Sequence, residues 1–533
     1  MLRWITLIGL AGLMAAQEPS SFRVNTRLVE VDVVVRSKDS AVTGLTKDDF
    51  RILDNGKPQN IATFSVRSSA SKGNAHPTPL PGGMISNRVD HSGEEPVAAT
   101  VILLDRLNTD VADQAYFTKE MLKYVKIMQP GEHVAIYTLL KSLRIAQDFT
   151  DDPKQLLEAA SKAGAQQSVS LASSDESALK AFSAGLFDDT DTSKITQDSI
   201  RGMEDAEKKN RALLTSAALE DIARHLRGLP GRKKLVWVSG GFPIGGLEVG
   251  GGAALSRFGD EYGTETAHAV RALNNANIAV YAIDPRGVVA SESNLMAAGL
   301  PQTGAGVGLG KTGLNAPNIA GMNLFASGTG GRAIYGTNDL VNAIKTVMED
   351  DQIVYTIGFY PTEQKMDGSY HKLSVKVARN GVEVHHRQGY LADDTKIFTP
   401  KQRREAMTDA VQNPLDSTEL GLRASIAAVS GQPGVYKLAV TLNVSELHLE
   451  HVKDRWVGNI DFGTHFSQAL DFKGSYETIL INLTEDRLRQ TLQNGFEFRR
   501  TIDSGGLTGE LRVVVQDRST GSIGSVRIPI GPT

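Results

Sequence analysis

Apolar and polar residues follow two periodicities along this chain, and in the middle of the chain strand-like and helix-like segments alternate as in an α/β fold. Apolar runs typical of strands in a parallel sheet recur there, at 99–105, 132–140, 143–149, 233–242 and 277–285. Helical spacing of apolar residues separates them, at 110–128, 153–163, 199–228 and 265–276. A short strand and a helix follow at 330–336 and 338–351. This alternation predicts a doubly wound, Rossmann-like domain over residues 98–351.

The segments on either side of this domain have the period-two alternation of β-strands. Residues 22–66 contain about four predicted strands, with Asn55-Gly56 as a hairpin turn, which is too few to close a sandwich. Residues 352–392 supply three more. We therefore expect one discontinuous β-sandwich-like domain into which the α/β domain is inserted. Residues 67–97, rich in Ser, Gly, Pro and Asn, are expected to be a linker.

A further all-β region is predicted from residue 415 to residue 533. It contains seven apolar runs separated by turn residues, a number and spacing typical of an immunoglobulin-like or fibronectin-like sandwich. A polar, partly helical link over 393–414 precedes it. The predicted fold class is therefore multidomain α/β plus β.

The first residues of the chain have the order of a secretory signal peptide. Arg3 precedes an apolar run that ends near residue 16, and this run is too short to span a bilayer comfortably. We predict a signal peptide over 1–16 and a secreted, periplasmic or cell-envelope protein with no integral membrane segment after cleavage. The chain has no cysteine, which excludes disulfides and thiol nucleophiles, and its net charge of −4 gives no reason to expect nucleic acid as a partner.

The stretch AGVGLGKT (305–312) fits a relaxed form of the phosphate-binding loop, which needs a strand before it and a helix after it. No β-branched run precedes it, and Gly313 and Pro317 stand where the helix should begin and continue. An exported protein also meets little ATP. We interpret the stretch as a glycine-rich surface loop and expect no nucleotide.

Catalytic groupings are sparse. Ser239 follows a buried strand but lacks the G-x-S-x-G elbow of α/β-hydrolases. His385 and His386 are adjacent in a predicted strand, so their side chains should point to opposite faces and not bind one metal together.

Three strand ends carry the polar residues that a doubly wound sheet would gather at its ligand-binding edge: LLDRLNT (103–109), VSGGFP (238–243) and AIDPRG (282–287). The order of elements, with LLDRLNT and LVWVSGG, resembles a von Willebrand factor type A domain. FRVNTRLVEVDVVV upstream and VYTIGFYP downstream are similar to an acidobacterial family of exported von Willebrand factor A-related proteins. The resemblance covers roughly residues 22 to 392.

The resemblance implies a Mg²⁺ or Mn²⁺ site built from D-x-S-x-S, a distant threonine and a later aspartate. Asp105 and Thr109 match two of these positions, and Thr215 is a candidate for the threonine. Leu107 stands in place of the first serine and Gly240 in place of the aspartate. Hard cations require oxygen ligands, so we expect no required cofactor and at most weak Mg²⁺ binding through Asp105 and Thr109.

Taken together, these features predict an exported, non-enzymatic protein-binding protein, an adhesin or scaffold with a degenerate metal site. The predicted partner-binding loops carry Asp105, Asn108, Thr109, Ser239, Gly240 and Asp284. The alternative is a secreted hydrolase that uses the loops around Asp105, Ser239 and Asp284.

Overall fold

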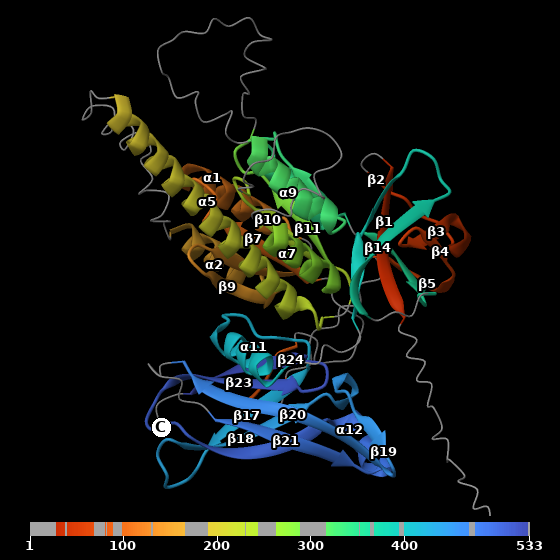
Figure 1. The fold of residues 1–533 in the computed structure, drawn as a ribbon, viewed down its shortest axis with the longest axis vertical. Helices are drawn as coiled ribbons and strands as arrows, with labels where there is room; N and C mark the ends of the chain where they lie inside the picture. The colour runs from red at the N-terminus through yellow and green to blue at the C-terminus, as the bar shows by residue number, and fades with distance from the viewer. Residues whose placement is uncertain are drawn as a thin grey trace, which may run out of the picture.

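The computed structural model describes residues 28–37, 40–68, 80, 83–88, 99–128, 132–165, 190–229, 231–242, 263–287, 316–350, 352–362, 367–393, 399–467 and 475–530. They form an α/β body, a β body beside it and a larger β-sandwich at the carboxyl end of the chain (Figure 1). The multidomain α/β plus β architecture expected from the sequence is confirmed. The predicted signal peptide (1–16) and the stretch 305–312 lie outside the described residues.

The α/β body is built on a six-stranded sheet of order β12-β11-β10-β7-β8-β9. Its strands are β7 (Ala99–Asp105), β8 (His133–Leu139), β9 (Leu143–Thr150), β10 (Lys233–Val238), β11 (Ile278–Ile283) and β12 (Arg332–Ile334). All neighbours pair in parallel except β8 and β9. Counted in chain order the strands stand 3-2-1-4-5-6, so the direction of winding reverses between β7 and β10. Doubly wound sheets bind ligands beyond the strand ends at such a reversal.

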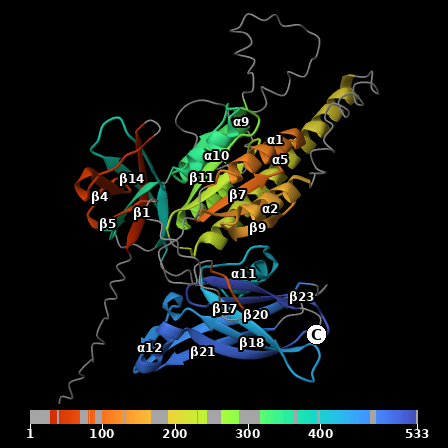
Figure 2. The ribbon, with the colours of Figure 1, turned by 180° about the vertical axis from the view of Figure 1, so that it is seen from behind.

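Helices cover both faces of this sheet, so its central strands are buried throughout and mostly apolar (Figure 2). One face packs against α1 (Val111–Val125), α2 (Pro153–Ala165) and α10 (Leu340–Met348). The other packs against α5 (Thr190–Leu226), α7 (Gly263–Asn275) and α9 (Ala316–Gly328). No helix within the described ranges is long and apolar enough to cross a membrane.

Helix α9 corrects one argument made from the sequence. Gly313 and Pro317 were expected to prevent a helix, yet α9 begins at Ala316 with Pro317 in its first turn. Proline is tolerated there because the first N–H groups of a helix have no partner within the helix.

The β body draws strands from both sides of the α/β body in the sequence. One of its sheets has the order β15-β1-β13-β5, with β2 paired to β1, and the other has the order β16-β14-β3-β4. The strands are β1 (Val29–Ser37), β2 (Ser40–Ala41), β3 (Phe50–Asp54), β4 (Lys57–Gln59), β5 (Ile61–Ser68), β13 (Ile353–Phe359), β14 (Asp367–Val377), β15 (Glu383–His386) and β16 (Gly389–Asp393). Asn55 and Gly56, both with positive φ, form the turn between β3 and β4.

The carboxyl-terminal sandwich contains two sheets, of order β22-β18-β17-β6 and β19-β20-β23-β24, with β21 paired to β20. Its elements are α11 (Pro400–Gln412), β17 (Leu422–Ala428), β18 (Val435–Leu442), β19 (Glu450–Val452), β20 (Arg455–Phe466), β21 (Tyr476–Leu483), α12 (Glu485–Asn494), β22 (Phe496–Asp503), β23 (Gly509–Asp517) and β24 (Ile523–Ile530).

Part of the predicted linker 67–97 belongs to this sandwich, which corrects the expectation. Strand β6 (Met84–Ser86) pairs with β17. The buried Asn87 donates to the carbonyl oxygens of Ser417 and Leu420, each at 2.7 Å, and accepts from Leu422 N at 2.9 Å. Because these bonds join residues more than 300 positions apart, no local sequence pattern predicts them.

Buried charges join the β body to the α/β body. Arg36 on β1 donates to Asp350 at 2.8 Å, and Tyr281 on β11 donates to the same carboxylate at 2.5 Å. Asn277, before β11, donates to Asp32 on β1 at 2.9 Å. We call this boundary the seam.

Lys233, next to the seam, is 2% exposed, and its Nζ donates to the carbonyl oxygen of Leu229 at 2.7 Å. Burial lowers the pKa of Lys233 to about 7, with attraction from Asp32 opposing the shift. A lysine in an unfolded chain titrates near 10.4, so between about pH 7 and pH 10 the unfolded state binds more protons than the folded state. Stability should therefore rise with pH in this window, by up to about 1.4 kcal/mol per unit.

We expect Lys233→Met to remove this rise, because methionine keeps the apolar stem and does not titrate. Denaturation of the natural chain and the variant at pH 7.5 and 9 measures the difference. Lys162→Met, at an exposed position on α2, should leave the rise intact. Equal pH slopes in the natural chain and Lys233→Met would contradict the assignment.

Candidate functional site

The carboxyl ends of β7, β10 and β11 bring three of the predicted site residues to one edge of the sheet. Asp105 is the last residue of β7, Ser239 follows β10 and Asp284 follows β11. The parallel registers align Leu104 with Val238 and Val238 with Ile283, so the three strands end at the same level.

Asp105 is the centre of this edge, and it is 1% exposed. Its Oδ2 accepts from the side chains of Asn108 at 2.8 Å, Ser239 at 2.9 Å and Trp237 at 3.1 Å. Its Oδ1 accepts from the backbone N–H of Asn108 at 3.1 Å. Both carboxylate oxygens are therefore engaged by donors of the protein itself.

Burial raises the pKa of Asp105, and the bonds from Asn108, Ser239 and Trp237 lower it only in part. With a raised pKa the folded state binds more protons than the unfolded state above about pH 3.9. The contribution of Asp105 to stability therefore declines as the pH rises from about 3.9 to the raised pKa of the folded state.

Thr109 and Gly240 join the loop after β7 to the loop after β10. The Thr109 hydroxyl donates to the carbonyl oxygen of Asp105 at 2.5 Å and accepts from Gly240 N at 2.9 Å. A Cβ placed on Gly240 would lie 2.7 Å from the carbonyl oxygen of Asn108. This position therefore needs glycine, and an aspartate side chain has no room to start there.

Asn108 extends the network to helix α5. Its Nδ2 donates to the Thr215 hydroxyl at 2.9 Å, and that hydroxyl donates to the carbonyl oxygen of Arg211 at 2.8 Å. The threonine suggested by loose spacing therefore does reach the site.

Trp237 is a site residue that sequence reasoning missed. Its ring is fully buried and packs edge-on against Phe242 and Phe325, while its indole N–H reaches Asp105. A signal was present in the sequence, because a buried tryptophan usually finds an acceptor and Asp105 ends the neighbouring strand.

Leu107 and Asp284 do not contribute oxygens to the network. The Leu107 side chain is 3% exposed and belongs to the core beneath the sheet end. Asp284 accepts from Arg286 Nε and Nη2, both at 2.8 Å, which is a two-pronged ion pair within its own loop. Asp284 is therefore paired with Arg286 and is not part of the Asp105 network, although both aspartates lie at the same sheet edge.

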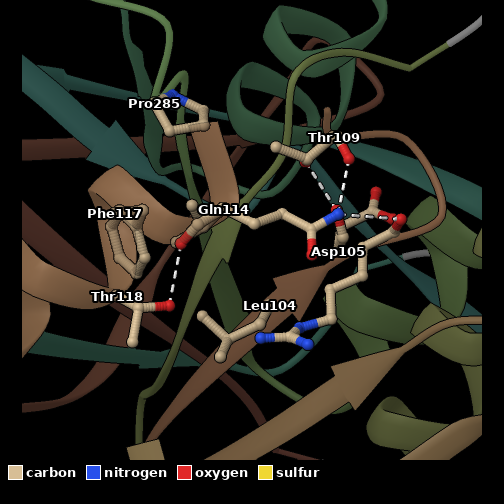
Figure 3. Close-up of a pocket in the computed structure, with 9 residues that line it drawn as sticks. Leu104, Asp105, Thr109, Gln114, Phe117, Thr118 and Pro285 are labelled. Carbon is tan, nitrogen blue, oxygen red and sulfur yellow. Dashed lines mark hydrogen bonds between the residues drawn. The ribbon is translucent and has the colours of Figure 1, made fainter. Parts of the chain in front are cut away.

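A small cavity of about 10 Å³ lies beside Asp105, between β7 and α1. That is roughly the space of one water molecule. In Figure 3 the Gln114 side chain points toward Thr109, and its Nε2 donates to the Thr109 carbonyl oxygen at 2.6 Å. The Thr118 hydroxyl donates to the backbone carbonyl oxygen of Gln114 at 2.8 Å. The cavity is too small for a substrate.

Among the described residues no histidine hydrogen-bonds to Ser239, so the Ser–His pair of a hydrolase is not formed there. It is fully buried, and its hydrogen-bond partners are Asp105, Gly241 and Ile283. No group of three or more His, Asp or Glu side chains suited to a metal occurs among the described residues.

We expect Gly240→Ala to lower the free energy of unfolding by about 1–3 kcal/mol, because the added methyl group must push the Asn108 carbonyl away. Chemical denaturation measures this. Gly202→Ala is the matched control: no atom lies within 4 Å of its added Cβ, and it stands inside a helix. The control should be neutral or slightly stabilising. A Gly240→Ala protein as stable as the natural chain would contradict the close approach.

No protein-family model matches this chain, and neither does any curated protein. Similar solved structures include an aerotolerance-related membrane protein from Bacteroides fragilis, with 14% identity, a TM-score of 0.27 and coverage of 48% of this chain and 99% of that chain. A von Willebrand factor type A structure from Catenulispora acidiphila shows 7% identity, a TM-score of 0.25 and coverage of 88% and 74%.

The three N-terminal domains of a type V pili tip protein from Porphyromonas gingivalis show 8% identity, a TM-score of 0.27 and coverage of 89% and 78%. Von Willebrand factor A-type structures are thus among the neighbours, but these identities and TM-scores are too low to assign a family or a function.

Proposed function

We propose that this chain is an exported, non-enzymatic protein-binding protein, an adhesin or scaffold, whose α/β domain is of von Willebrand factor A type. In this proposal residues 98–351 form that domain, 22–66 with 352–392 form the discontinuous β-domain, and 415–533 form the terminal sandwich. Membership of the acidobacterial exported family and secretion through residues 1–16 remain predictions of the same proposal.

The observation that carries the proposal is the saturation of Asp105. A cation bound there would have to displace the donors from Asn108, Ser239 or Trp237. Ser239 could donate to the Gly241 carbonyl instead, but the buried indole N–H of Trp237 would lose its acceptor. Leu107 and Gly240 supply no side-chain oxygen in exchange. The residues present therefore do not fit a Mg²⁺ site, and we expect partner binding to be independent of divalent cations.

The same burial changes the role expected for the predicted contact residues. Asp105, Thr109, Ser239 and Asp284 are each at most 3% exposed, so they position loops and do not touch a partner themselves. Tyr335, directly after β12 at the same sheet edge, is 51% exposed. Exposed tyrosines are frequent anchors of protein interfaces. We infer that Tyr335 contacts the partner.

Capture of envelope proteins from the source organism on the immobilised protein tests this proposal. We expect Tyr335→Ala to weaken capture at least tenfold, and EDTA to leave it unchanged. Val66→Ala, a 51% exposed apolar residue on the β-domain, is the matched control and should bind normally. Capture that EDTA abolishes and Mg²⁺ restores would contradict the proposal.

A further inference from the structure

His386 lies where the β body rests on the α/β body. As the last residue of β15 it pairs with Val33 of β1. A Cβ placed on Gly330, in the turn between α9 and β12, would collide with the carbonyl group of His386, and Gly330 also has a φ of +77°. The backbone of His386 therefore rests directly on that turn, and the contact belongs to the seam.

Two hydrogen bonds require the neutral form of the His386 ring. The backbone N–H of Val375 on β14 donates to Nε2 at 3.2 Å, so Nε2 must carry a lone pair. Nδ1 lies 2.7 Å from the carbonyl oxygen of Arg387, which can only accept, so Nδ1 carries the proton. A second proton on Nε2 would face the Val375 N–H, donor against donor.

The charges around His386 also oppose a second proton. Burial lowers its pKa, the bond to the Arg387 carbonyl opposes this shift, and the charges of Arg232, His385 and Arg387 lower the pKa further. Arg232 comes from the turn before β10 and donates to the Gly330 carbonyl at 2.7 Å, so it stands inside the same contact.

The nearby carboxylates are already engaged. Asp32 on β1 accepts from Asn277 at 2.9 Å and from Thr356 at 2.5 Å. Asp350, after α10, accepts from Arg36 and Tyr281. Neither hydrogen-bonds to the His386 ring, whose partners are Val375 and Arg387.

We propose that His386 is an acid-sensitive latch, whose protonation releases the β15–β16 turn from its contact with the Gly330 turn of the α/β body. Protonation breaks the bond to Val375 and places a third cation beside Arg232 and Arg387. The β15–β16 turn, which contacts Gly330, is then no longer held by the bond between His386 and Val375.

The direction of the pH dependence follows from the lowered pKa of His386. Above about pH 6.5 the ring is neutral in both the docked and the released states. As the pH falls further the released state takes up a proton first, so the docking constant falls by up to about tenfold per pH unit. The fall ends at the lower pKa of the docked state.

Hydrogen exchange of the natural chain, corrected for the intrinsic effect of pH, tests the latch without any variant. Between pH 6.5 and 5.5 we expect protection of the Val375 amide and of peptides over 383–393 to fall three- to tenfold. Val514 on β23, buried beneath α11, should change less than twofold. A Val375 protection that changes less than twofold would overturn the proposal.

The second arm compares His386→Gln with His385→Gln. Glutamine at 386 can accept from Val375 through its side-chain carbonyl and does not titrate, so the acid-induced loss of protection should disappear. His385→Gln is the matched control and should keep the acid-induced loss of protection at Val375. The pKa of His385 is also lowered, first by burial, and its charged neighbours are Asp350, Arg232, Glu383 and Arg332. An undiminished acid response in folded His386→Gln would refute the latch. If that variant does not fold, the exchange of the natural chain decides alone.

Discussion

Replacing Asp105 with alanine is expected to lower the free energy of unfolding of the α/β domain by about 3–5 kcal/mol at neutral pH. The side chains of Asn108, Ser239 and Trp237 donate to this buried carboxylate. Asn108 and Trp237 would each lose this acceptor, whereas Ser239 could still donate to the Gly241 carbonyl. An unsatisfied buried donor costs about 1–3 kcal/mol, and relief from burying the carboxylate offsets part of the sum. Fluorescence of Trp237, in a background with both Trp4→Phe and Trp456→Phe, would follow the unfolding of this domain.

Asp110→Ala is the matched control for Asp105. Asp110 stands in the same loop, is exposed, and makes no side-chain cap to α1 although it is the N-cap residue. Its replacement should change stability by no more than about 0.5 kcal/mol. If Asp105→Ala were as stable as Asp110→Ala, the carboxylate would not be a structural centre and the site would have to be reconsidered.

The second large effect is expected at the seam. Asp350→Ala should destabilise the protein by about 3–5 kcal/mol, because the buried Arg36 guanidinium would lose its carboxylate and Tyr281 its acceptor. Thermal unfolding followed by calorimetry measures the loss, and the seam should open first. The expected signature is faster hydrogen exchange over β1 and β15 than in the natural chain.

Glu349→Ala controls for the position. Glu349 is the neighbouring acid, with 49% of its side chain exposed, and its ion pair with Lys345 spans 3.8 Å. Such exposed pairs contribute at most about 1 kcal/mol. Equal losses in Asp350→Ala and Glu349→Ala would show that the buried ion pair does not hold the two bodies together.

The sequence was sufficient to predict the elements of the α/β body, because strands covered on both faces are mostly apolar and the helices between them have a 3.6-residue period. It also located Asp105, Ser239 and Asp284 at strand ends. It did not predict which of them interact, since that depends on side-chain direction. Asp284 accepts hydrogen bonds from Arg286, whereas Trp237, which the sequence did not indicate, donates to Asp105.

Features that depend on contacts distant in the sequence were beyond prediction. Strand β6 has three residues, and only its pairing with β17 makes it a strand. Asp32 and Arg36 interrupt an apolar strand, and their partners lie on other elements far along the chain. The local sequence pattern does not predict that Gly330 contacts the backbone of His386.

The central claim is that Asp105 serves the protein's own hydrogen bonds and not a cation. Titration calorimetry of the natural chain with Mg²⁺ and with Mn²⁺ tests it most directly. We expect no saturable heat up to millimolar metal. A dissociation constant in the micromolar range, lost in folded Asp105→Asn and kept in Asp110→Ala, would contradict it.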